Sequence, residues 1–363
     1  MLCGRAGGMC EFEGCNKRLF YDNVTLAEFN NSFVAHIIAS SENGPRGDAK
    51  LSPEMSDKIE NLMLMCADHH KLIDNNETGP RDYPVSKLRK MKKDHEEKMD
   101  KICELFNTPE TEIVLFSSPI KGKDEVDIDY KKAVQAVVPT KRPASNYGTC
   151  LRTSSPFEYR TSQYWEDCCT SLEIQCQRSI LTPYKNKYLS RFSIFSIAPI
   201  PLIIKLGEII GDKIPCDIYQ KTREPDTWKW QSKELTNSFD IKRECNNNKN
   251  NKVALIVALT SDISIDRINE VGEFEETYKI SAINKGVDCI KSLPDLSAFW
   301  HLYQKVCDEI LDRNGRNCEI QLFPAVPVSV AFEIGRRYMK KVYPRIKVFD
   351  ECNGFFETIV IGG

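Results

Sequence analysis

The sequence predicts a small α+β module at the N-terminus, followed by a larger α/β domain built from two similar halves. Three observations support this fold class. Two short pairs of Cys and His, separated by about fifty residues, are typical of a module stabilised by a metal ion. Beyond them, apolar strand-like runs alternate with helical ones. The chain also has 363 residues, which is too long for one ordinary core.

The composition excludes several classes of protein. The chain is 41% hydrophobic and 28% charged with a net charge of −2, so no global basic field attracts nucleic acid, and any such contact must be local. No stretch resembles a signal peptide or is long enough to span a bilayer, which predicts a cytoplasmic protein without a membrane partner. Fifteen cysteines in that compartment favour reduced thiols or metal ligands.

The expected domain boundaries follow changes in composition. Dense charges around a narrow apolar stripe predict a long surface helix over residues 84–106, which would end a first domain at residues 1–106. Residues 107–147 contain scattered prolines and a charge run, and we expect a linker with a few docked strands. A second domain would then occupy residues 148–363.

The two halves of the second domain are expected from a repeated pattern. "SRFSIFSIA", "PIPLIIKLGEIIGD" and "IPCDIYQ" predict strand, helix and strand, and "CEIQLF", "PAVPVSVAFEIGRRYMKK" and "RIKVFD" predict the same order. Each predicted helix follows a Pro-rich turn and contains a glycine, Gly207 or Gly335. The sequence contains neither the dinucleotide fingerprint nor a phosphate-binding loop, which disfavours a nicotinamide enzyme or a nucleoside triphosphatase.

The candidate structural metal site consists of Cys10 and Cys15 together with Cys66 and His69. Two pairs of such ligands fit a closed tetrahedral Zn²⁺ site, and the zinc would help a module with a thin core to fold. Cys3 is then a spare thiol. The alternative, that these are unrelated buried thiols, stays open at this point.

A second group of residues has the chemistry of phosphodiester hydrolysis. His36 lies in the predicted strand "FVAH", and Asn61 introduces a return strand. His70 and Asp74 follow on a predicted helix, where four-residue spacing lets both ligate one divalent ion. A one-metal phosphodiesterase needs a base to activate water, an amide to hold that base and a cation to neutralise the phosphate.

In this order, and beside the Cys/His pairs, these residues resemble the HNH nuclease family with its ββα-metal fold and attached zinc site. The resemblance implies that His36 is the general base, that Asn61 orients it and that His70 holds Mg²⁺ or a similar ion. One departure is Ala35, which stands where many members have a metal ligand, so the ion would depend on His70, Asp74, water and an acidic residue such as Asp22 or Glu28. Another is His69, which stands where a fourth cysteine is common.

The second domain resembles the SAVED domain, a fusion of two CARF-like Rossmann units that senses cyclic oligonucleotides. The resemblance rests on "FSIFSIAPIPLIIKLGEIIGDKIPCDIYQK", "TWKWQ" and "LFPAVPVSVAFEIGRRYMKK". An HNH domain followed by SAVED is the architecture of bacterial antiphage effectors in cyclic-oligonucleotide signalling (CBASS). It implies a DNA endonuclease that degrades double-stranded DNA after a cyclic oligonucleotide binds the SAVED domain. We expect this ligand to be a cyclic dinucleotide. It also implies a homo-oligomer, a dimer that assembles further on binding the ligand.

Candidate contacts with these partners can be named. Aromatic rings can stack on a base and cations can meet phosphates. The candidates for the ligand pocket are Lys221, Arg223, Trp228, Trp230, Phe323 and Pro201. For DNA, the candidates are the basic residues of "KLRKMKK" at 87–93 and Arg46 in the loop after the proposed base.

Two other functions remain open from the sequence. One is a restriction-type HNH nuclease whose C-terminal domain recognises DNA; the absence of a strong basic stripe after residue 185 disfavours it. The other is a zinc-stabilised adaptor without enzymatic activity that binds a nucleotide and signals to a partner, and in that case His36 would be dispensable.

Overall fold

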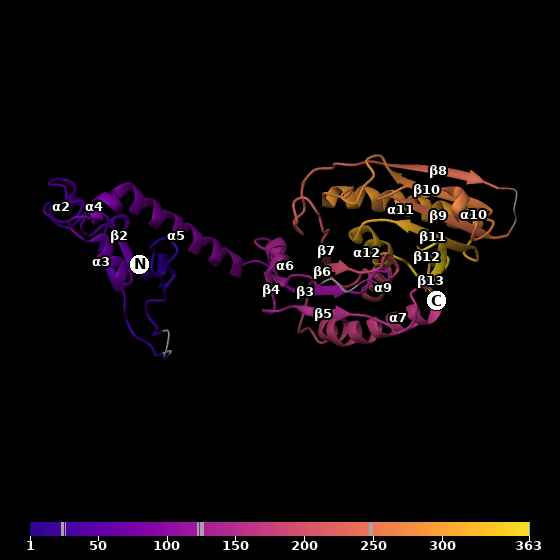
Figure 1. The fold of residues 1–363 in the computed structure, drawn as a ribbon, viewed down its shortest axis with the longest axis horizontal. Coiled ribbons are helices and arrows are strands. Elements are labelled where there is room, and N and C mark those ends of the chain that lie inside the picture. Colours follow the sequence, from indigo (N-terminus) through magenta and orange to yellow (C-terminus); the bar gives the residue numbers. More distant parts are fainter. Residues whose placement is uncertain (23–24, 26, 122, 124–126, 247–249, 363) are drawn as a thin grey trace. The chain divides into compact units, whose positions relative to one another are not determined.

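The computed structural model describes residues 1–22, 25, 27–121, 123, 127–246 and 250–362. It divides the chain into two compact units, Met1–Thr108 and Pro109–Gly363, each with its own apolar core (Figure 1). Within the described ranges, none of the helices combines the length and apolar character needed to cross a bilayer.

The first unit is built on a two-stranded antiparallel sheet followed by a helix. Strand β1 (Phe33–His36) pairs with β2 (Leu62–Met65), which places His36 opposite Leu62. The chain then enters α3 (Ala67–Ile73), which packs against β1, and the expected strand, strand, helix order is therefore present. The long helix α5 (Val85–Phe106) covers the core with Leu88 and Met91. The remaining elements are short: α1 (Leu2–Arg5), α2 (Leu51–Met55), the 3-10 turn Ile59–Asn61 and α4 (Gly79–Asp82).

The first half of the second unit contains a parallel sheet in the order β4, β3, β6, β7, with β5 also paired to β3. Its strands are β3 (Glu110–Ser117), β4 (Arg142–Pro143), β5 (Thr149–Arg152), β6 (Phe192–Ile197) and β7 (Cys216–Ile218). Its helices are α6 (Tyr130–Val137), α7 (Ser162–Cys176), the π-helical turn Gln177–Leu181, α8 (Thr182–Lys185) and α9 (Ile200–Ile210).

The second half contains a six-stranded sheet in the order β13, β12, β11, β9, β10, β8. The four inner strands are parallel, and the two edge strands run antiparallel to their neighbours. The strands are β8 (Phe239–Cys245), β9 (Lys252–Ala258), β10 (Glu276–Ala282), β11 (Glu319–Ala325), β12 (Ile346–Glu351) and β13 (Phe355–Ile361). The helices are α10 (Ile265–Asn269), α11 (Leu293–Asn314) and α12 (Val328–Arg336).

Two equivalent helices join the halves. Helix α9 follows β6 and α12 follows β11, and both predicted strand, helix, strand passages are present with parallel strands (Figure 1). The helices cross so closely that a Cβ on Gly207 would overlap the carbonyl of Phe332, while a Cβ on Gly335 would overlap that of Ile204. Only glycine permits this approach at the two equivalent positions.

The structure corrects the expected linker at 107–147. Strand β3 lies between β4 and β6 and is buried from Thr111 to Ser117, so this stretch is an inner part of the second unit. Its apolar run, "IVLF", is short and stands between charged segments, so the sequence pattern around it favours a linker over a buried strand.

Candidate metal and nuclease site

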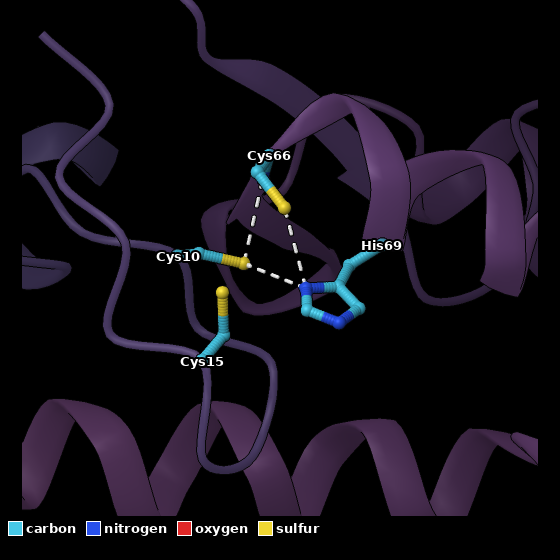
Figure 2. Close-up of side chains that lie close together, drawn as sticks. All are labelled: Cys10, Cys15, Cys66 and His69. Carbon is cyan, nitrogen blue, oxygen red and sulfur yellow. Dashed lines mark hydrogen bonds between the residues drawn. The ribbon is translucent and has the colours of Figure 1, made fainter. Parts of the chain in front are cut away.

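Four potential metal ligands of the first unit converge, as Figure 2 shows. Cys10 and Cys15 lie on the N-terminal loop, whereas Cys66 occupies the N-cap position of helix α3 and His69 lies in the first turn of that helix. The Nδ1 atom of His69 is 3.2 Å from Sγ of Cys66 and 3.7 Å from Sγ of Cys10. All four donor atoms lie within 4.8 Å of one another, so the cluster can hold a metal ion.

The surroundings of this cluster suit a bound cation. The ring of Phe12 stacks on His69 with 4.0 Å between centroids, which fixes the imidazole plane. Burial raises the pKa of the Cys10 thiol to about 12, so this thiol is protonated at neutral pH unless a cation stabilises the thiolate. Three sulfurs and one imidazole nitrogen form a donor set typical of structural zinc.

His36 occupies the end of strand β1 and is half-buried. Its Nε2 atom lies 3.2 Å from the carbonyl oxygen of Ser56. A carbonyl only accepts hydrogen bonds, so the proton of the neutral ring is on Nε2 and the lone pair is on Nδ1. This tautomer leaves Nδ1 as the basic nitrogen of His36.

The fully buried Asn61 fixes the chain just after His36. Its Nδ2 donates to the carbonyl of Ile38 and its Oδ1 accepts from the amide of the same residue, both at 2.8 Å. The side chain therefore holds the backbone two residues beyond His36 and acts on the imidazole through the strand.

His70 and Asp74 face each other at the C-terminal end of α3. The Nε2 atom of His70 is 3.4 Å from Oδ2 of Asp74, and both side chains are about one third exposed. The sequence predicted this shared face from the four-residue spacing. Of the two further acidic candidates, Asp22 accepts a hydrogen bond from the amide of Thr25 at 2.7 Å, and Glu28 forms a β-bridge with Tyr21.

Arg46 is a site residue whose role the sequence did not reveal. Its side chain is only 3% exposed, and its Nη2 atom lies 3.2 Å from Oδ1 of Asp74 and 3.3 Å from the carbonyl of His36. Nε and Nη1 donate to the carbonyls of Ile37 and Ile73 at 2.8 and 2.6 Å. The expected contact of Arg46 with DNA is therefore wrong, because the guanidinium is buried and engaged inside the unit.

The basic stretch at 87–93 lies on helix α5. Lys87, Arg89, Lys90 and Lys93 are exposed there, as a surface that contacts DNA would require. Lys92 differs, because it is buried and pairs with Glu96 at 2.6 Å.

In the second unit the structure corrects three of the expected ligand contacts. Trp228 is buried with its ring 5.2 Å from that of Phe195. Phe323 is fully buried, with its ring 4.8 Å from that of Phe349, and Pro201 is buried inside α9. These side chains form core and cannot stack on a ligand base, since their surfaces are already covered.

The other three candidates remain near the surface. Lys221 pairs with Asp226 and lies over the Trp228 ring at 5.6 Å, Arg223 is exposed, and Trp230 is half-buried. The structure also shows a contact that the sequence did not suggest. Gln220, after β7, accepts from the Ser329 amide at 3.1 Å and from its hydroxyl at 2.8 Å, which joins the first half to the start of α12.

Comparisons with known proteins agree with the division of the chain into an N-terminal and a C-terminal unit. Residues 174–361, just over half of the chain, match the family model described as "SMODS-associated and fused to various effectors sensor domain" (SAVED). Residues 23–79 match the model described as "HNH endonuclease". The HNH match includes His36, Asn61 and His70 but begins after Cys10 and Cys15. None of the curated proteins is a match.

Several solved structures are similar to this chain at low identity. A Cap4 SAVED/CARF-domain containing receptor from Acinetobacter baumannii, in complex with the cyclic trinucleotide 2'3'3'-cAAA, has 10% identity and a TM-score of 0.47, covering 79% of this chain and 66% of that one. The same receptor with 3'3'3'-cAAA has 9% identity and a TM-score of 0.46, covering 76% and 60%.

The corresponding receptor from Moraxella osloensis has 11% identity and a TM-score of 0.41, covering 79% of this chain and 66% of that one. The chain thus spans about two thirds or less of the length of these structures. By the match over residues 174–361, the chain belongs to the SAVED family, and it carries a segment similar to HNH endonucleases ahead of that domain.

Proposed function

We propose that the chain is a metal-dependent DNA endonuclease that is switched on when a cyclic oligonucleotide binds its SAVED domain. The observation that carries the proposal is the arrangement around β1 and α3. One small unit carries the half-buried His36 with its basic Nδ1, the amide of Asn61 that fixes its strand, and the imidazole of His70. This second imidazole faces the carboxylate of Asp74. The expected setting is antiphage defence of the CBASS type.

Each side chain has a chemical task in this proposal. Nδ1 of His36 takes a proton from the attacking water, and Asn61 keeps the strand in place. His70 and Asp74 would hold a divalent ion such as Mg²⁺, since their nitrogen and oxygen already converge. Such an ion neutralises charge on the scissile phosphate and the leaving oxygen. Arg46, bonded to both the His36 carbonyl and Asp74, fixes the base strand relative to these two ligands.

The Cys/His cluster has a structural task. We assign zinc to Cys10, Cys15, Cys66 and His69, because no position in a site with four protein ligands remains open for substrate. The zinc would join the N-terminal loop to the start of α3, the helix that also carries His70.

The proposed switch lies at the carboxyl ends of the parallel strands, where ligands of open α/β sheets bind. Helices α9 and α12 begin there, and helix N-termini favour phosphate. A cyclic dinucleotide, with two similar nucleotides, suits the two similar halves. We further propose that its binding promotes assembly of a dimer into a larger homo-oligomer that cuts both DNA strands.

A plasmid assay tests the proposal. Purified chain is incubated with supercoiled plasmid and Mg²⁺, alone and with a panel of cyclic di- and trinucleotides. We expect linear and fragmented DNA only with one or a few of the ligands. Cutting that is indifferent to every ligand would favour a restriction-type nuclease, and binding of a ligand without any cutting would favour the zinc-stabilised adaptor.

A further inference from the structure

A basic hollow lies at the amino-terminal edge of the six-stranded sheet in the second unit. It has a volume of about 970 Å³. Its charged lining consists of five cations and one carboxylate, namely Arg316, Lys340, Lys341, Arg345, Lys347 and Glu319. The chain as a whole carries 50 Lys and Arg against 52 Asp and Glu, so the hollow is a strong local concentration of positive charge.

The loop that bears most of these cations is held in place. The hydroxyl of Tyr338 donates to the carbonyl of Pro344 at 2.9 Å, and that of Tyr343 donates to Asp308 at 2.7 Å. Arg316 also donates to the carbonyl of Lys340 at 3.2 Å. The loop between helix α12 and strand β12 is therefore fixed before any ligand binds, which lowers the entropic cost of binding.

Part of the charge in the hollow is not neutralised by nearby carboxylates. The Nζ atom of Lys347 lies 3.2 Å from carboxylate oxygens of both Glu319 and Glu357, which neutralise its positive charge. Lys341 and Arg345 are exposed, and in the described ranges of the chain neither has an ion-pair partner. These two side chains offer their charge to an external anion.

The hollow is far from the proposed cyclic-oligonucleotide site. Glu319, which lines it, begins strand β11, whereas α12 starts beyond the other end of that strand, after Ala325. A seven-residue strand is about 20 Å long, so the two sites are at opposite edges of the sheet. Any ligand of the hollow would therefore be distinct from the cyclic oligonucleotide.

We propose that the basic hollow binds the phosphate backbone of double-stranded DNA. This inference rests on the proposed nuclease function. The nuclease unit, Met1–Thr108, carries 15 Lys and Arg against 18 Asp and Glu, so its net charge repels DNA. Lys341 and Arg345 can contact phosphates without reading sequence, and Arg345 can do so with two parallel hydrogen bonds. The SAVED unit would thus supply phosphate contacts in addition to those of the exposed cations on helix α5, for a nuclease unit whose net charge is unfavourable for DNA.

Charge reversal tests the proposal in the full-length chain. Lys341→Glu and Arg345→Glu are introduced together in a His36→Ala background, and binding of a labelled 20-base-pair duplex is followed by anisotropy between 50 and 200 mM KCl. We expect affinity to fall roughly tenfold or more at low salt, and the salt slope to fall by about two, because two phosphate contacts are lost. The matched control, Lys131→Glu with Lys233→Glu, changes the charge equally at exposed positions elsewhere on the unit; it should weaken binding less than about threefold.

Two results would overturn the inference: unchanged DNA binding in the hollow variant, or an equal loss of binding in the control pair. If DNA binding were unchanged and the hollow variant sedimented as a smaller species, the hollow would instead take a second copy of the chain. The proposed nuclease function fails separately, because the plasmid assay uses the unmodified chain. DNA binding that depends on the hollow, in a chain that never cuts, would support this inference and contradict that function.

Discussion

The guanidinium of Arg46 lies 3.2 Å from the carboxylate of Asp74, 28 residues away in the sequence. Because the same Nη2 atom reaches the carbonyl of His36, the strand of the proposed base and the helix of the proposed metal ligands are joined by one side chain. Arg46 thus positions the site although it is neither the proposed base nor a proposed metal ligand. Its removal should disturb both strand β1 and helix α3.

We predict that Arg46→Ala destabilises the first unit by about 3 kcal/mol, because the carbonyls of Ile37 and Ile73 lose their donor and Asp74 loses its partner. Tryptophan fluorescence does not report on this unit, since all four Trp residues belong to the second unit. Hydrogen exchange of peptides covering residues 33–48 is the suitable measurement. The control is Arg81→Ala, which removes an exposed pair with Asp82 and should leave the exchange of these peptides nearly unchanged, because solvent screens such a pair. Equal exchange in the two variants would contradict the prediction.

The zinc assignment predicts one equivalent of zinc for each purified chain, measured by elemental analysis. Cys66→Ser should lose most of this zinc and increase hydrogen exchange around α3, because Cys66 is one of the four proposed ligands and stands at the N-cap position of that helix. Cys3→Ser is the matched control, since Cys3 is an exposed cysteine outside the cluster. Full zinc content in the Cys66 variant would refute the assignment.

The role of His36 predicts a selective loss. His36→Ala should reduce ligand-dependent plasmid cutting by at least about a hundredfold, since a general base contributes that much or more. Zinc content, thermal stability and ligand binding should stay close to those of the unmodified chain, because besides the base the change removes only one hydrogen bond, to the carbonyl of Ser56. His301→Ala, at an exposed position on α11, should cut normally. If the His36 variant cut the plasmid at the normal rate, His36 could not be the general base.

Several elements could be predicted from the sequence because their signals are local. The order of His36, Asn61 and His70 along the chain predicted the strand, strand, helix order of the first unit, and the Cys/His spacing predicted the four side chains that converge. The burial of Trp228 and Phe323 could not be predicted, because the sequence does not show whether an aromatic ring is covered. Their burial depends on partners such as Phe195 and Phe349, which are distant in the sequence.

The role of Arg46 was not predictable for a similar reason. Its guanidinium donates four hydrogen bonds to groups in or next to strand β1 and helix α3, and the sequence around it resembles an ordinary polar turn. Strand β3 was read as linker since its neighbours in sequence are polar, although its neighbours in space are strands β4, β5 and β6.

The crossing of α9 and α12 gives a prediction for the SAVED unit. Alanine is favoured over glycine in a helix by about 1 kcal/mol. Even so, Gly335→Ala should destabilise the second unit by roughly 3 kcal/mol, because the new Cβ overlaps the Ile204 carbonyl and forces the helices apart. Urea unfolding followed by tryptophan fluorescence measures this change. Gly272→Ala is the control, since its Cβ would meet open space. A Gly335 variant as stable as the control would mean that the helices do not cross so closely.

The last prediction concerns pH and Glu276, which begins strand β10. Burial acts to raise the pKa of this carboxyl, but hydrogen bonds from Asn314, Tyr278 and Arg313 and the charge of Arg243 outweigh it and lower the pKa to about 2. The folded state therefore binds a proton at Glu276 less readily than the unfolded state, whose carboxyl has a pKa of about 4.3. The resulting stabilisation is complete above about pH 5 and is lost as the pH falls toward 2.

Glu276→Gln should accordingly lower the stability of the second unit at pH 7 by roughly 2 kcal/mol, because the charged partners remain without their carboxylate. It should also flatten the dependence of stability on pH between 5 and 3, since the variant has no proton to gain there. Urea unfolding at several pH values measures both effects, and Glu273→Gln, at an exposed position nearby, should preserve the wild-type slope. Parallel profiles for the wild type and the Glu276 variant would show that the four groups around this carboxylate do not stabilise its charge.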